Sequence, residues 1–571
     1  MSVARNRQWI MTACSLTLAA CASTLQTEYY GTTEPFASEA VYFVLTDRFV
    51  DGDSSNNHSQ QGGANRTFDR PLRRANGVPD NIGYLGGDFR GLLDHAAYIR
   101  EMGFTAVWIT PIVDNPDEAF TGGFGIGEGM FADRGKTGYH GYWGVNFYRV
   151  DEHLESTGLN FAEFARRMRA DHDLRIVLDI VCNHGSPSYT MPVDQPGFGE
   201  IYDASGRLMA DHENLPPQEL DRANPLHRWY HAQPDLAELS NLDDTKPEVM
   251  DYLVGAYLQW IGQGASAFRI DTIRHMPHAF WREFTARIRA EHPGFFMFGE
   301  SFDYDAAKIA EHTWPENGAV SVLDFPGRAR MLEVFENPGS DYGRLLDYLH
   351  LEDGVYRNPY ELMTFYDNHD VTRMKASEDG FIDAHNWLFT SRGIPVVYYG
   401  SEMAFMTGTK EHEGNRNYFG PERIAGAREH RIRRALAHIA RIRRDSPALQ
   451  RGLQLNLGIG RDRATLLRVY EKDGVNQTAL VLLNKAGADA RFVIDRWISA
   501  GLWHDASSGE QVEVKGGRAP LELVVPAHGV RVLLLDARND DPRLLAELNR
   551  AMSAGTAGSN RHLTAAGGTH H

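Results

Sequence analysis

Short apolar runs alternate with amphipathic segments along most of this chain, and this alternation is the strongest constraint on its fold. The segments between the runs have apolar residues at helical spacing, as in Leu92–Met102, Phe161–Met168, Val249–Ile261, Phe280–Ile288 and Ile432–Ile442. The strand-like runs are Ala40–Leu45, Ala106–Ile109, Arg175–Ile180, Ala267–Ile270, Phe295–Phe298, Ala319–Leu323, Leu362–Phe365 and Val396–Tyr399. Eight strands, each followed by a helix or a long excursion, predict an α/β chain folded as a (β/α)8 TIM barrel.

Two stretches depart from the alternation and predict further domains. The stretch at about 183–238 is too long for one helix and is rich in Gly, Pro, Asp and His, which indicates a small domain inserted after the third strand, over the barrel mouth. After the barrel (39–447), alternating runs with turn residues between them predict an all-β sandwich over 448–538. Residues 539–571 include a short helical segment and then Gly, Ala, Ser and Thr, and we expect a disordered tail.

The N-terminus has the pattern of an exported bacterial lipoprotein. Residues 1–20 combine an arginine-containing start with an apolar run too short to span a bilayer, which is typical of a signal peptide. Leu18-Ala19-Ala20-Cys21 resembles a lipoprotein cleavage box with Cys21 as the acylated residue. We expect residues 21–38 to be a lipidated polar tether to the outer membrane, facing the periplasm or the cell surface. The alternative is an ordinary signal peptide and a secreted protein.

Charge and cysteine content exclude some classes of partner and fold. The formal net charge of −18 argues against a nucleic-acid partner held by phosphate contacts. With Cys14 and Cys21 near the N-terminus, Cys182 stands alone in the body, so no disulfide framework is possible there. No protein partner can be inferred.

Polar residues gather at the predicted strand ends. They are Gly138-Tyr139-His140-Gly141-Tyr142-Trp143 after the second strand, Asn183-His184 after the third, Arg269 and Asp271 at the fourth, Glu300 at the fifth, and Asp367-Asn368-His369-Asp370 at the seventh. Because the carboxyl ends of barrel strands share one rim, we expect these side chains to converge there.

Paired carboxyl groups are the usual equipment for glycoside hydrolysis. Asp271 and Arg269 share a strand face, and a carboxylate held charged by a cation suits a nucleophile. Glu300 follows an apolar strand near other acids, which raises a carboxyl pKa and suits a general acid/base. Asp370 would stabilise the transition state. Taken alone, Asp271 also fits a surface turn.

The histidines of the rim have two readings. His140, His184 and His369 would hydrogen-bond sugar hydroxyls and orient the ring. Each histidine on its own also fits a structural hydrogen bond, and only their joint position at the strand ends favours binding.

At this point the chain resembles the α-amylase family of glycoside hydrolases over about residues 40–540. The matching motifs are Asp179-Ile180-Val181-Cys182-Asn183-His184, Phe268-Arg269-Ile270-Asp271, Phe298-Gly299-Glu300 and Phe365-Tyr366-Asp367-Asn368-His369-Asp370. The resemblance implies retaining cleavage of α-1,4-glucosidic bonds in starch, maltodextrins or related α-glucans, through a covalent intermediate on Asp271. It implies that Tyr142 stacks on a sugar and that Arg274 and Phe302 contact the acceptor side. The full set of implied substrate-binding residues is His140, Tyr142, Trp143, His184, Arg269, Arg274, Phe302, His369 and Arg416.

Within the family, the chain looks most similar to cyclodextrin glucanotransferases and related α-amylases, on Asp47-Arg48-Phe49, Asp51–Asn57, Gly86–Phe89 and Thr390–Pro395. Two features favour hydrolysis over cyclisation: no starch-binding module follows the β-domain, and Gly206–Asp211 lacks the aromatic around which the family's glucan coils. Phe302 matches an aromatic of the family's acceptor site, so transfer of the glycosyl group to a second sugar remains an alternative. The alternatives are a cyclodextrin glucanotransferase, a cyclodextrin- or pullulan-degrading hydrolase, and a non-catalytic glucan-binding lipoprotein, which the three intact acids disfavour.

The resemblance also implies calcium in two places. The first is a pair of loops rich in hard oxygen ligands, with Asp51, Asp53, Asn56, Asn57, Gly86 and Asp88. The second lies where barrel and insert meet, with Asn183, Asp211 and the carbonyl of His275. Calcium there would fasten the insert and would take no part in the chemistry.

Overall fold

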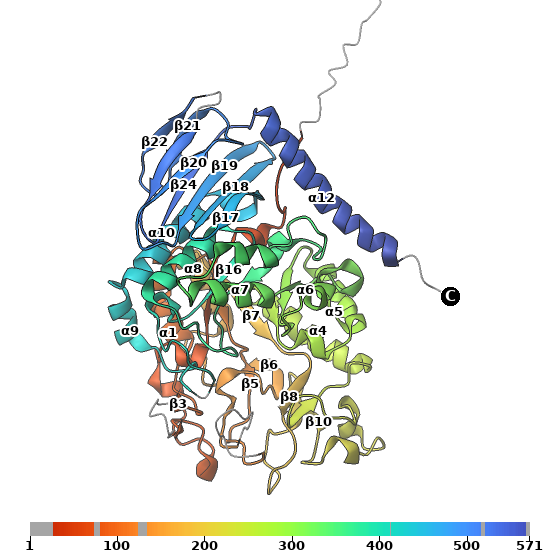
Figure 1. Ribbon diagram of the computed structural model, residues 1–571. Coiled ribbons are helices and arrows are strands. Elements are labelled where there is room, and N and C mark those ends of the chain that lie inside the picture. The colour runs from red at the N-terminus through yellow and green to blue at the C-terminus, as the bar shows by residue number, and fades with distance from the viewer. Residues whose placement is uncertain (1–26, 73–79, 124–133, 412, 516–519, 567–571) are drawn as a thin grey trace, which may run out of the picture.

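A closed barrel of eight parallel strands forms the centre of the computed structural model (Figure 1). The structure describes residues 27–72, 80–123, 134–411, 413–515 and 520–566, with side chains as far as residue 554. The barrel strands are β1 (Val41–Val44), β4 (Ala106–Ile109), β7 (Arg175–Ile180), β12 (Ala265–Ile270), β13 (Phe296–Gly299), β14 (Ser321–Val322), β15 (Met363–Thr364) and β16 (Ile394–Tyr398).

The sheet closes between β14 and β15, the two strands at the ends of its hydrogen-bonded order. A parallel bridge joins Leu323 to Met363, and the amide of Asp324 donates to the carbonyl of Met363 at 2.9 Å. Nearly every strand residue is buried, because side chains fill the interior and helices cover the outside. The predicted TIM barrel is confirmed.

The helices that follow the strands are α1 (Phe89–Asp94), α2 (Ala96–Glu101), α3 (Phe161–His172), α4 (Pro247–Gly262), α5 (His278–Glu291), α6 (Ala306–Ala310), α7 (Phe325–Phe335), α8 (Glu378–Thr390), α9 (Gly420–Ala427), α10 (Arg431–Arg444) and α11 (Pro447–Arg451). The one helix predicted over Leu92–Met102 is two helices that meet at His95. The His95 ring Nδ1 lies 2.9 Å from the carbonyl of Gly91, which the backbone amide of residue 95 would otherwise use.

The insert is a small irregular domain built on two short antiparallel pairs. Strand β8 (His184–Pro187) pairs with β11 (Leu239–Asn241), and β9 (Glu200–Tyr202) pairs with β10 (Leu208–Asp211). Its apolar cluster joins Met191 and Phe198 to Phe120 and Trp143 of the loop after β4. Shorter pairs in the barrel loops are β2 (Pro71–Leu72) with β3 (Asp80–Asn81) and β5 (Val113–Asp114) with β6 (Asn146–Val150).

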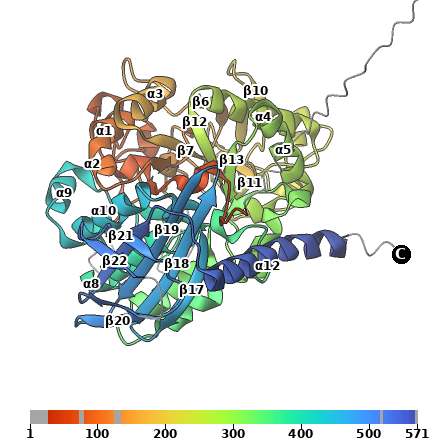
Figure 2. The same ribbon diagram turned by 90° about the horizontal axis from the view of Figure 1, so that it is seen from above.

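The C-terminal domain is all-β, as predicted, with a six-stranded antiparallel sheet and a separate pair. The sheet has the order β17 (Leu453–Gly460), β18 (Arg463–Lys472), β19 (Val475–Asn484), β24 (Gly529–Leu535), β21 (Gly501–Asp505), β22 (Gln511–Val514). The pair is β20 (Ala490–Ile494) with β23 (Leu521–Val525). Figures 1 and 2 show this domain over one side of the barrel, and the insert strands lie on the opposite side.

The prediction of a disordered tail is wrong for most of its length. Residues Pro542–Ala566 form helix α12, which begins against the C-terminal domain and extends beyond it (Figure 2). Leu544, Leu548 and Ala551 lie on one helical face and are buried in the core of that domain. The sequence indicated a short helical segment here, and its low-complexity end led to the expectation of disorder. Residues 567–571 lie outside the described residues.

The predicted polar tether also differs from the structure where it is described. Tyr29 pairs with Glu471 of β18, and the amide of Gly31 donates to the carbonyl of Arg451. Phe36 is buried and stacks on Phe296 of β13 at 4.5 Å. Residues 27–38 are therefore part of the packed body. The signal peptide and Cys21 lie outside the described residues. In the described part of the chain, no helix combines the length and apolarity needed to cross a bilayer.

Candidate active site

Arg269 is the centre of the site, beneath a cleft at the carboxyl ends of the strands. In the register of β12 with β7 it lies beside Asp179, and its Nη1 contacts the Asp179 carboxylate at 2.9 and 3.1 Å. The same Nη1 lies 2.8 Å from Oδ1 of Asp271, and Nη2 lies 2.9 Å from Oε2 of Glu300. The guanidinium is fully buried, so three acids converge on one fixed cation.

Glu300 follows β13 and has the environment of a proton donor. Burial raises the pKa of Glu300 to about 8; Arg269 opposes this shift, while Asp370 and Asp271 add to it. The second oxygen, Oε1, is buried and has no hydrogen-bond partner in the described structure. Glu300 lines the cleft, so this oxygen is available to a bound molecule.

Asp370 lines the same cleft and is held by a second cation. Arg416 places Nη2 at 2.7 Å from Oδ1 of Asp370, and its Nε donates to the carbonyl of His369 at 3.1 Å. The Nε2 of His369 lies 3.2 Å from Oδ2 of Asp370. Burial raises the pKa of Asp370, and Arg416 opposes that shift.

The predicted sugar-binding histidines are neutral imidazoles. Burial lowers the pKa values of His140, His184 and His369. Nδ1 of His140 accepts from the amide of Tyr142 at 3.1 Å, so the ring proton is on Nε2, which is buried without a partner. That N–H is free to donate to a hydroxyl in the cleft.

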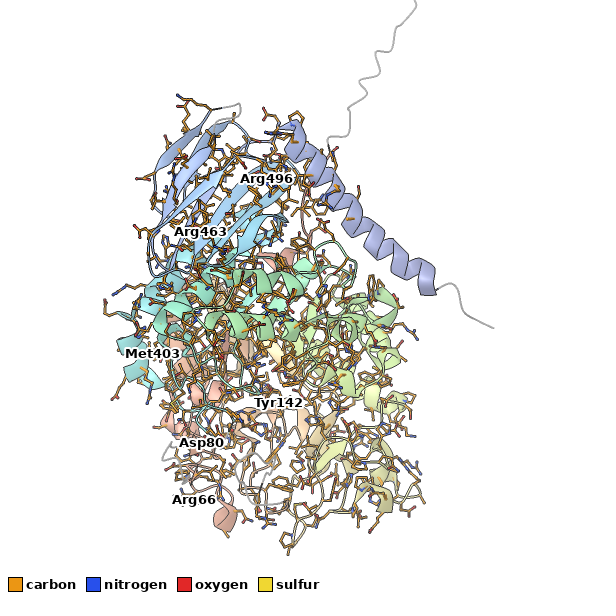
Figure 3. All side chains as sticks on the ribbon, in the orientation of Figure 1. Arg66, Asp80, Tyr142, Met403, Arg463 and Arg496 are labelled. Carbon is orange, nitrogen blue, oxygen red and sulfur yellow. The ribbon has the colours of Figure 1, made fainter. Side chains whose placement is uncertain are left out.

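Tyr142 forms part of the cleft floor, on the side of the barrel away from the C-terminal domain (Figure 3). Its hydroxyl donates to Asp179 at 2.7 Å, and its ring stacks on His369 at 5.3 Å between centroids. This hydrogen bond fixes the ring orientation, as a sugar-stacking platform requires.

The structure brings the predicted catalytic residues and, except for Arg269, the predicted substrate-binding residues to the lining of one cleft of about 650 Å³. Arg269 lies beneath its lining, and Phe302 is 41% exposed at its edge. The backbone turns sharply just after Asp271, since Thr272 has a φ of +48°, which costs a β-branched residue roughly 1–3 kcal/mol. The lining residues are Lys136, His140, Tyr142, Trp143, His184, Leu236, Ala237, Leu239, Asp271, Thr272, Arg274, His275, Glu300, Phe302, His369, Asp370, Glu411 and Arg416.

Sequence reasoning missed two kinds of cleft residue. Lys136 and Glu411 form an ion pair at 3.1 Å, and neither belongs to a strand end, so no strand-based signal marks them. The insert contributes Leu236, Ala237 and Leu239, from just before and within β11. The segment 206–211, which the sequence analysis placed at the cleft, lies in and before β10 and does not line it.

The predicted first metal loop offers a set of free oxygens. Oδ1 of Asn56 and Oδ1 of Asn57 are buried and have no hydrogen-bond partner in the described structure. Asn57 Oδ1 and Asp51 Oδ2 both face Gly86, where an added Cβ would come within 2.3 and 2.9 Å of them. Hard oxygens around a small space fit calcium.

Asp88 and Asp53, the other two acids of this predicted metal loop, do not face Gly86 but make hydrogen bonds within the loop. Asp88 braces the loop, because its carboxylate accepts from the amide of Asp53 at 2.9 Å and from the side chain of Asn56 at 3.1 Å. The Asp53 carboxylate accepts from the hydroxyl of Ser55 at the exposed surface.

The second predicted metal set contains one wrong member. Asp211 lies opposite Glu200 in the β9–β10 hairpin, and its carboxylate accepts from the amide of Glu213 at 2.7 Å. Asp235 stands there instead: its carboxylate accepts from Asn183 Nδ2 at 2.9 Å and lies 3.1 Å from Nδ1 of His275. The error arose because the irregular insert gives no periodic pattern by which to place its acids.

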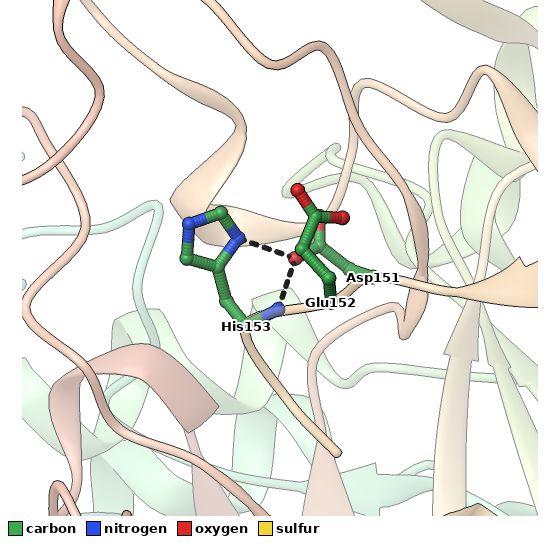
Figure 4. Close-up of side chains that lie close together, drawn as sticks. All are labelled: Asp151, Glu152 and His153. Atoms are coloured by element: carbon green, nitrogen blue, oxygen red, sulfur yellow. Dashed lines mark hydrogen bonds and ion pairs between the residues drawn. The ribbon is translucent and has the colours of Figure 1, made fainter. Parts of the chain in front are cut away.

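Two further groups of acids and histidines lie close together in the described residues, and neither was predicted. One is Asp151, Glu152 and His153 (Figure 4), where Nδ1 and the amide of His153 contact Asp151 Oδ1 at 2.8 and 3.0 Å. The other is His231, Asp243 and Asp244, next to the N-terminus of α4. In Figure 4 His153 bonds Asp151 through Nδ1 and its amide, and these contacts assign no metal.

The ordered acids, the buried arginine and the barrel agree with a family comparison. The model described as "Alpha amylase, catalytic domain" matches residues 43–447. The chain belongs to the α-amylase family. This α-amylase-family chain is therefore an enzyme of α-glucans, either a glycoside hydrolase or a transglycosylase.

The individual relatives include both glucanotransferases and an α-amylase. The chain is 28% identical over 546 residues to the cyclomaltodextrin glucanotransferase of Klebsiella oxytoca, which covers 86% of this chain and 76% of the relative. The crystal structure of CldA, described as the first cyclomaltodextrin glucanotransferase with a three-domain ABC distribution, is 27% identical with a TM-score of 0.70, over 87% of this chain and 99% of that one. An Anoxybacillus α-amylase has the same fold, at 24% identity and a TM-score of 0.67, over 89% and 99%.

The CldA comparison removes one argument made from the sequence. A chain described as a three-domain glucanotransferase shows that further modules are not required for that name. The expected lack of starch-binding modules therefore does not separate hydrolase from transferase.

Proposed function

We propose that this protein is a retaining α-glucan hydrolase that cleaves α-1,4-glucosidic bonds in starch or maltooligosaccharides. The observation that carries the retaining chemistry is the position of Arg269 between Asp271 and Glu300. One guanidinium contacts both carboxyl groups, which keeps them close, and a retaining pair needs a separation of roughly 5–5.5 Å.

In the first step Asp271 acts as the nucleophile and Glu300 as the acid. The Asp271 carboxylate forms a bond to C1 of the sugar while the C1–oxygen bond to the leaving chain breaks. The proton of Glu300 passes to that oxygen. Arg269 contacts the Asp271 carboxylate, and Asp370 with His369 stabilises the oxocarbenium-like transition state.

In the second step Glu300, now a carboxylate, takes a proton from water. The water oxygen bonds to C1 as the ester to Asp271 breaks, which returns both acids to their starting states. A sugar hydroxyl in place of water would give transglycosylation.

The insert favours water as the acceptor. Besides His184 at the start of β8, its residues at the cleft are the aliphatic Leu236, Ala237 and Leu239, so among the described residues it provides no Tyr, Phe or Trp platform for a coiled glucan. The same conclusion was drawn from Gly206–Asp211, and it now rests on different residues.

The experiment is a time course of products from soluble starch, pullulan and cyclodextrins. We expect linear maltooligosaccharides of α configuration from starch as the main early products. Cyclic dextrins as the main early product would refute hydrolysis and leave the retaining site intact. Products of inverted configuration would refute the roles given to Asp271 and Glu300.

The second candidate is a cyclodextrin glucanotransferase. Two of the compared proteins carry that name, and exposed Phe302 near Glu300 offers an acceptor sugar a flat face. Disproportionation of maltotriose into longer chains would favour it.

Calcium binding is part of the proposal. Asp51, Asn57 and Gly86 would hold one ion, with Asp88 bracing the loop, and Asn183 with Asp235 would hold another near the carbonyl of His275. The ion would supply structural charge that fixes the loops and the insert.

We also propose that the protein is exported and lipid-anchored through Cys21 to the outer membrane. The support is the sequence of residues 1–21. Palmitate labelling of the full chain, compared with Cys21→Ser, tests it: label in both or in neither would refute the anchor.

A further inference from the structure

A line of alternating charges connects the cleft rim to Asp370, the carboxylate that stabilises the transition state. Lys136 Nζ lies 3.1 Å from Oε1 of Glu411, Arg416 Nη1 lies 2.8 Å from the same oxygen, and Arg416 Nη2 contacts Asp370 at 2.7 Å. The side chains of Lys136 and Glu411 are only 9% and 16% exposed, although both line the cleft. An ion pair so little exposed is costly to separate.

The Lys136–Glu411 pair joins two different rim loops. Lys136 belongs to the loop after β4, and its carbonyl accepts from the amide of Phe120, which packs in the apolar cluster beneath the insert. Glu411 belongs to the loop after β16. Strand β1 lies between β4 and β16 in the barrel order, so the pair spans the mouth over the end of β1.

The chemistry identifies the side of the cleft on which this pair stands. Glu300 gives its proton to the leaving oxygen, so the leaving chain lies toward Glu300, where Phe302 and Arg274 line the cleft. The part of the glucan that stays on Asp271 extends the other way. Arg416 ties Glu411 to Asp370, and Lys136 Nζ lies 6.0 Å from the centroid of the Trp143 ring, so the pair stands with Asp370 and Trp143, and we take this as the donor side.

We propose that the Lys136–Glu411 ion pair closes the donor end of the cleft and limits how many glucose units extend beyond the one bonded to Asp271. The ammonium offers three donors and the carboxylate several acceptor sites, which suit the hydroxyls of a non-reducing chain end. The enzyme therefore transfers or releases short donor fragments counted from that end. This inference rests on the proposed action on α-glucans and adds a limit on the number of glucose units in the donor fragment.

The first experiment uses the unmodified enzyme and maltooligosaccharides of four to seven units, labelled at the reducing end. The label stays on the leaving fragment, so its length gives the donor length by difference. We expect a constant short donor fragment for every substrate length. Donor fragments that lengthen with the substrate would overturn the inference.

The second experiment opens the barrier. Lys136→Ala removes one side of the pair without touching Asp370, and we expect the main donor fragment from maltoheptaose to lengthen by at least one glucose unit. Glu411→Ala should do the same, with a further loss of rate because Arg416 loses a partner. The control is Lys485→Met, which removes the ion pair of buried Lys485 with exposed Asp462 (2.7 Å) in the C-terminal domain and should leave the pattern unchanged.

The outcomes separate the two proposals. An active Lys136→Ala enzyme with the unmodified pattern would overturn the donor-end barrier alone. Failure of the unmodified enzyme to cleave or transfer any α-glucan would overturn the proposed function. If Lys136→Ala does not fold, as judged by circular dichroism, the constant-length test on the unmodified enzyme still decides.

Discussion

The guanidinium of Arg269 lies 2.9 Å from the carboxyl group of Glu300, yet the pKa of Glu300 is raised to about 8. Burial is the main cause, and the negative charges of Asp370 and Asp271 add to it. Arg269 also serves Asp179 and Asp271, so its charge is shared among three acids. This sharing lets one carboxyl group near the arginine stay protonated at neutral pH, as an acid catalyst requires.

The first prediction is a loss of activity in alkaline solution. Glu300 must be protonated to act as the acid, so kcat/KM should fall about tenfold per pH unit above its pKa of about 8. A pH profile on a maltooligosaccharide measures this limb. A limb centred below pH 6 would contradict the assigned environment of Glu300.

The second prediction concerns stability against pH. The folded-state pKa values of Glu300 and Asp179, about 8 and about 7, lie above their ordinary values. The folded state thus binds these protons more tightly, and the stability this contributes is present at acidic pH and lost as pH rises toward 7–8. We expect Tm to fall between about pH 5 and pH 8, and to fall less in Glu300→Gln. An equal fall in both proteins would show that Glu300 does not contribute.

The third prediction separates the two carboxyl roles. Glu300→Ala should lower kcat by about 10²–10⁴-fold, and azide should restore turnover of a substrate with a good leaving group by attacking the glycosyl-enzyme from the face water uses. The glycosyl azide should retain the α configuration. In Asp271→Asn no such retained product should form. Exposed Glu422→Gln is the control and should keep full activity.

The fourth prediction concerns calcium removal. A ligand bound only to the folded state at 100 times its Kd adds about 2.7 kcal/mol, so a chelator should lower Tm and calcium should restore it. Asp51→Ala and Asp235→Ala should each reduce the calcium-dependent rise in Tm. Asp211→Ala is the matched control, because Asp211 lies in the β9–β10 hairpin, and it should keep the full rise. An unchanged Tm in chelator would contradict both sites.

The fifth prediction tests helix α12. Leu548 is fully buried, so Leu548→Ala should cost about 2–5 kcal/mol of C-terminal domain stability, measured by denaturant unfolding. Leu545→Ala, at a partly exposed position of the same helix, should cost less. Because the helix is remote from the cleft, kcat/KM should not change. Equal costs at the two positions would show that α12 does not pack as described.

Much of the fold and the catalytic centre could be predicted because both depend on local patterns. Eight apolar runs gave the barrel, and strand ends placed Asp271, Glu300 and Asp370 on one rim. Lys136, Glu411 and Asp235 escaped prediction since loops have no period, and their partners are far away in sequence. Helix α12 was predicted only as a short helical segment of a disordered tail, because its apolar stripe is short and precedes a low-complexity end.

Residues 27–38 were predicted to be loose, and they pack at the amino ends of the barrel strands, where Phe36 stacks on Phe296. If Cys21 carries lipid, only residues 22–26 separate it from the packed body, a reach of at most about 18 Å when fully extended. So short an anchor would restrict the orientation of the protein at the membrane as well as its distance from it. It would hold the C-terminal domain, with which Tyr29 pairs at Glu471, toward the lipid and turn the cleft, on the side of the barrel away from that domain, outward to polymers arriving from solution.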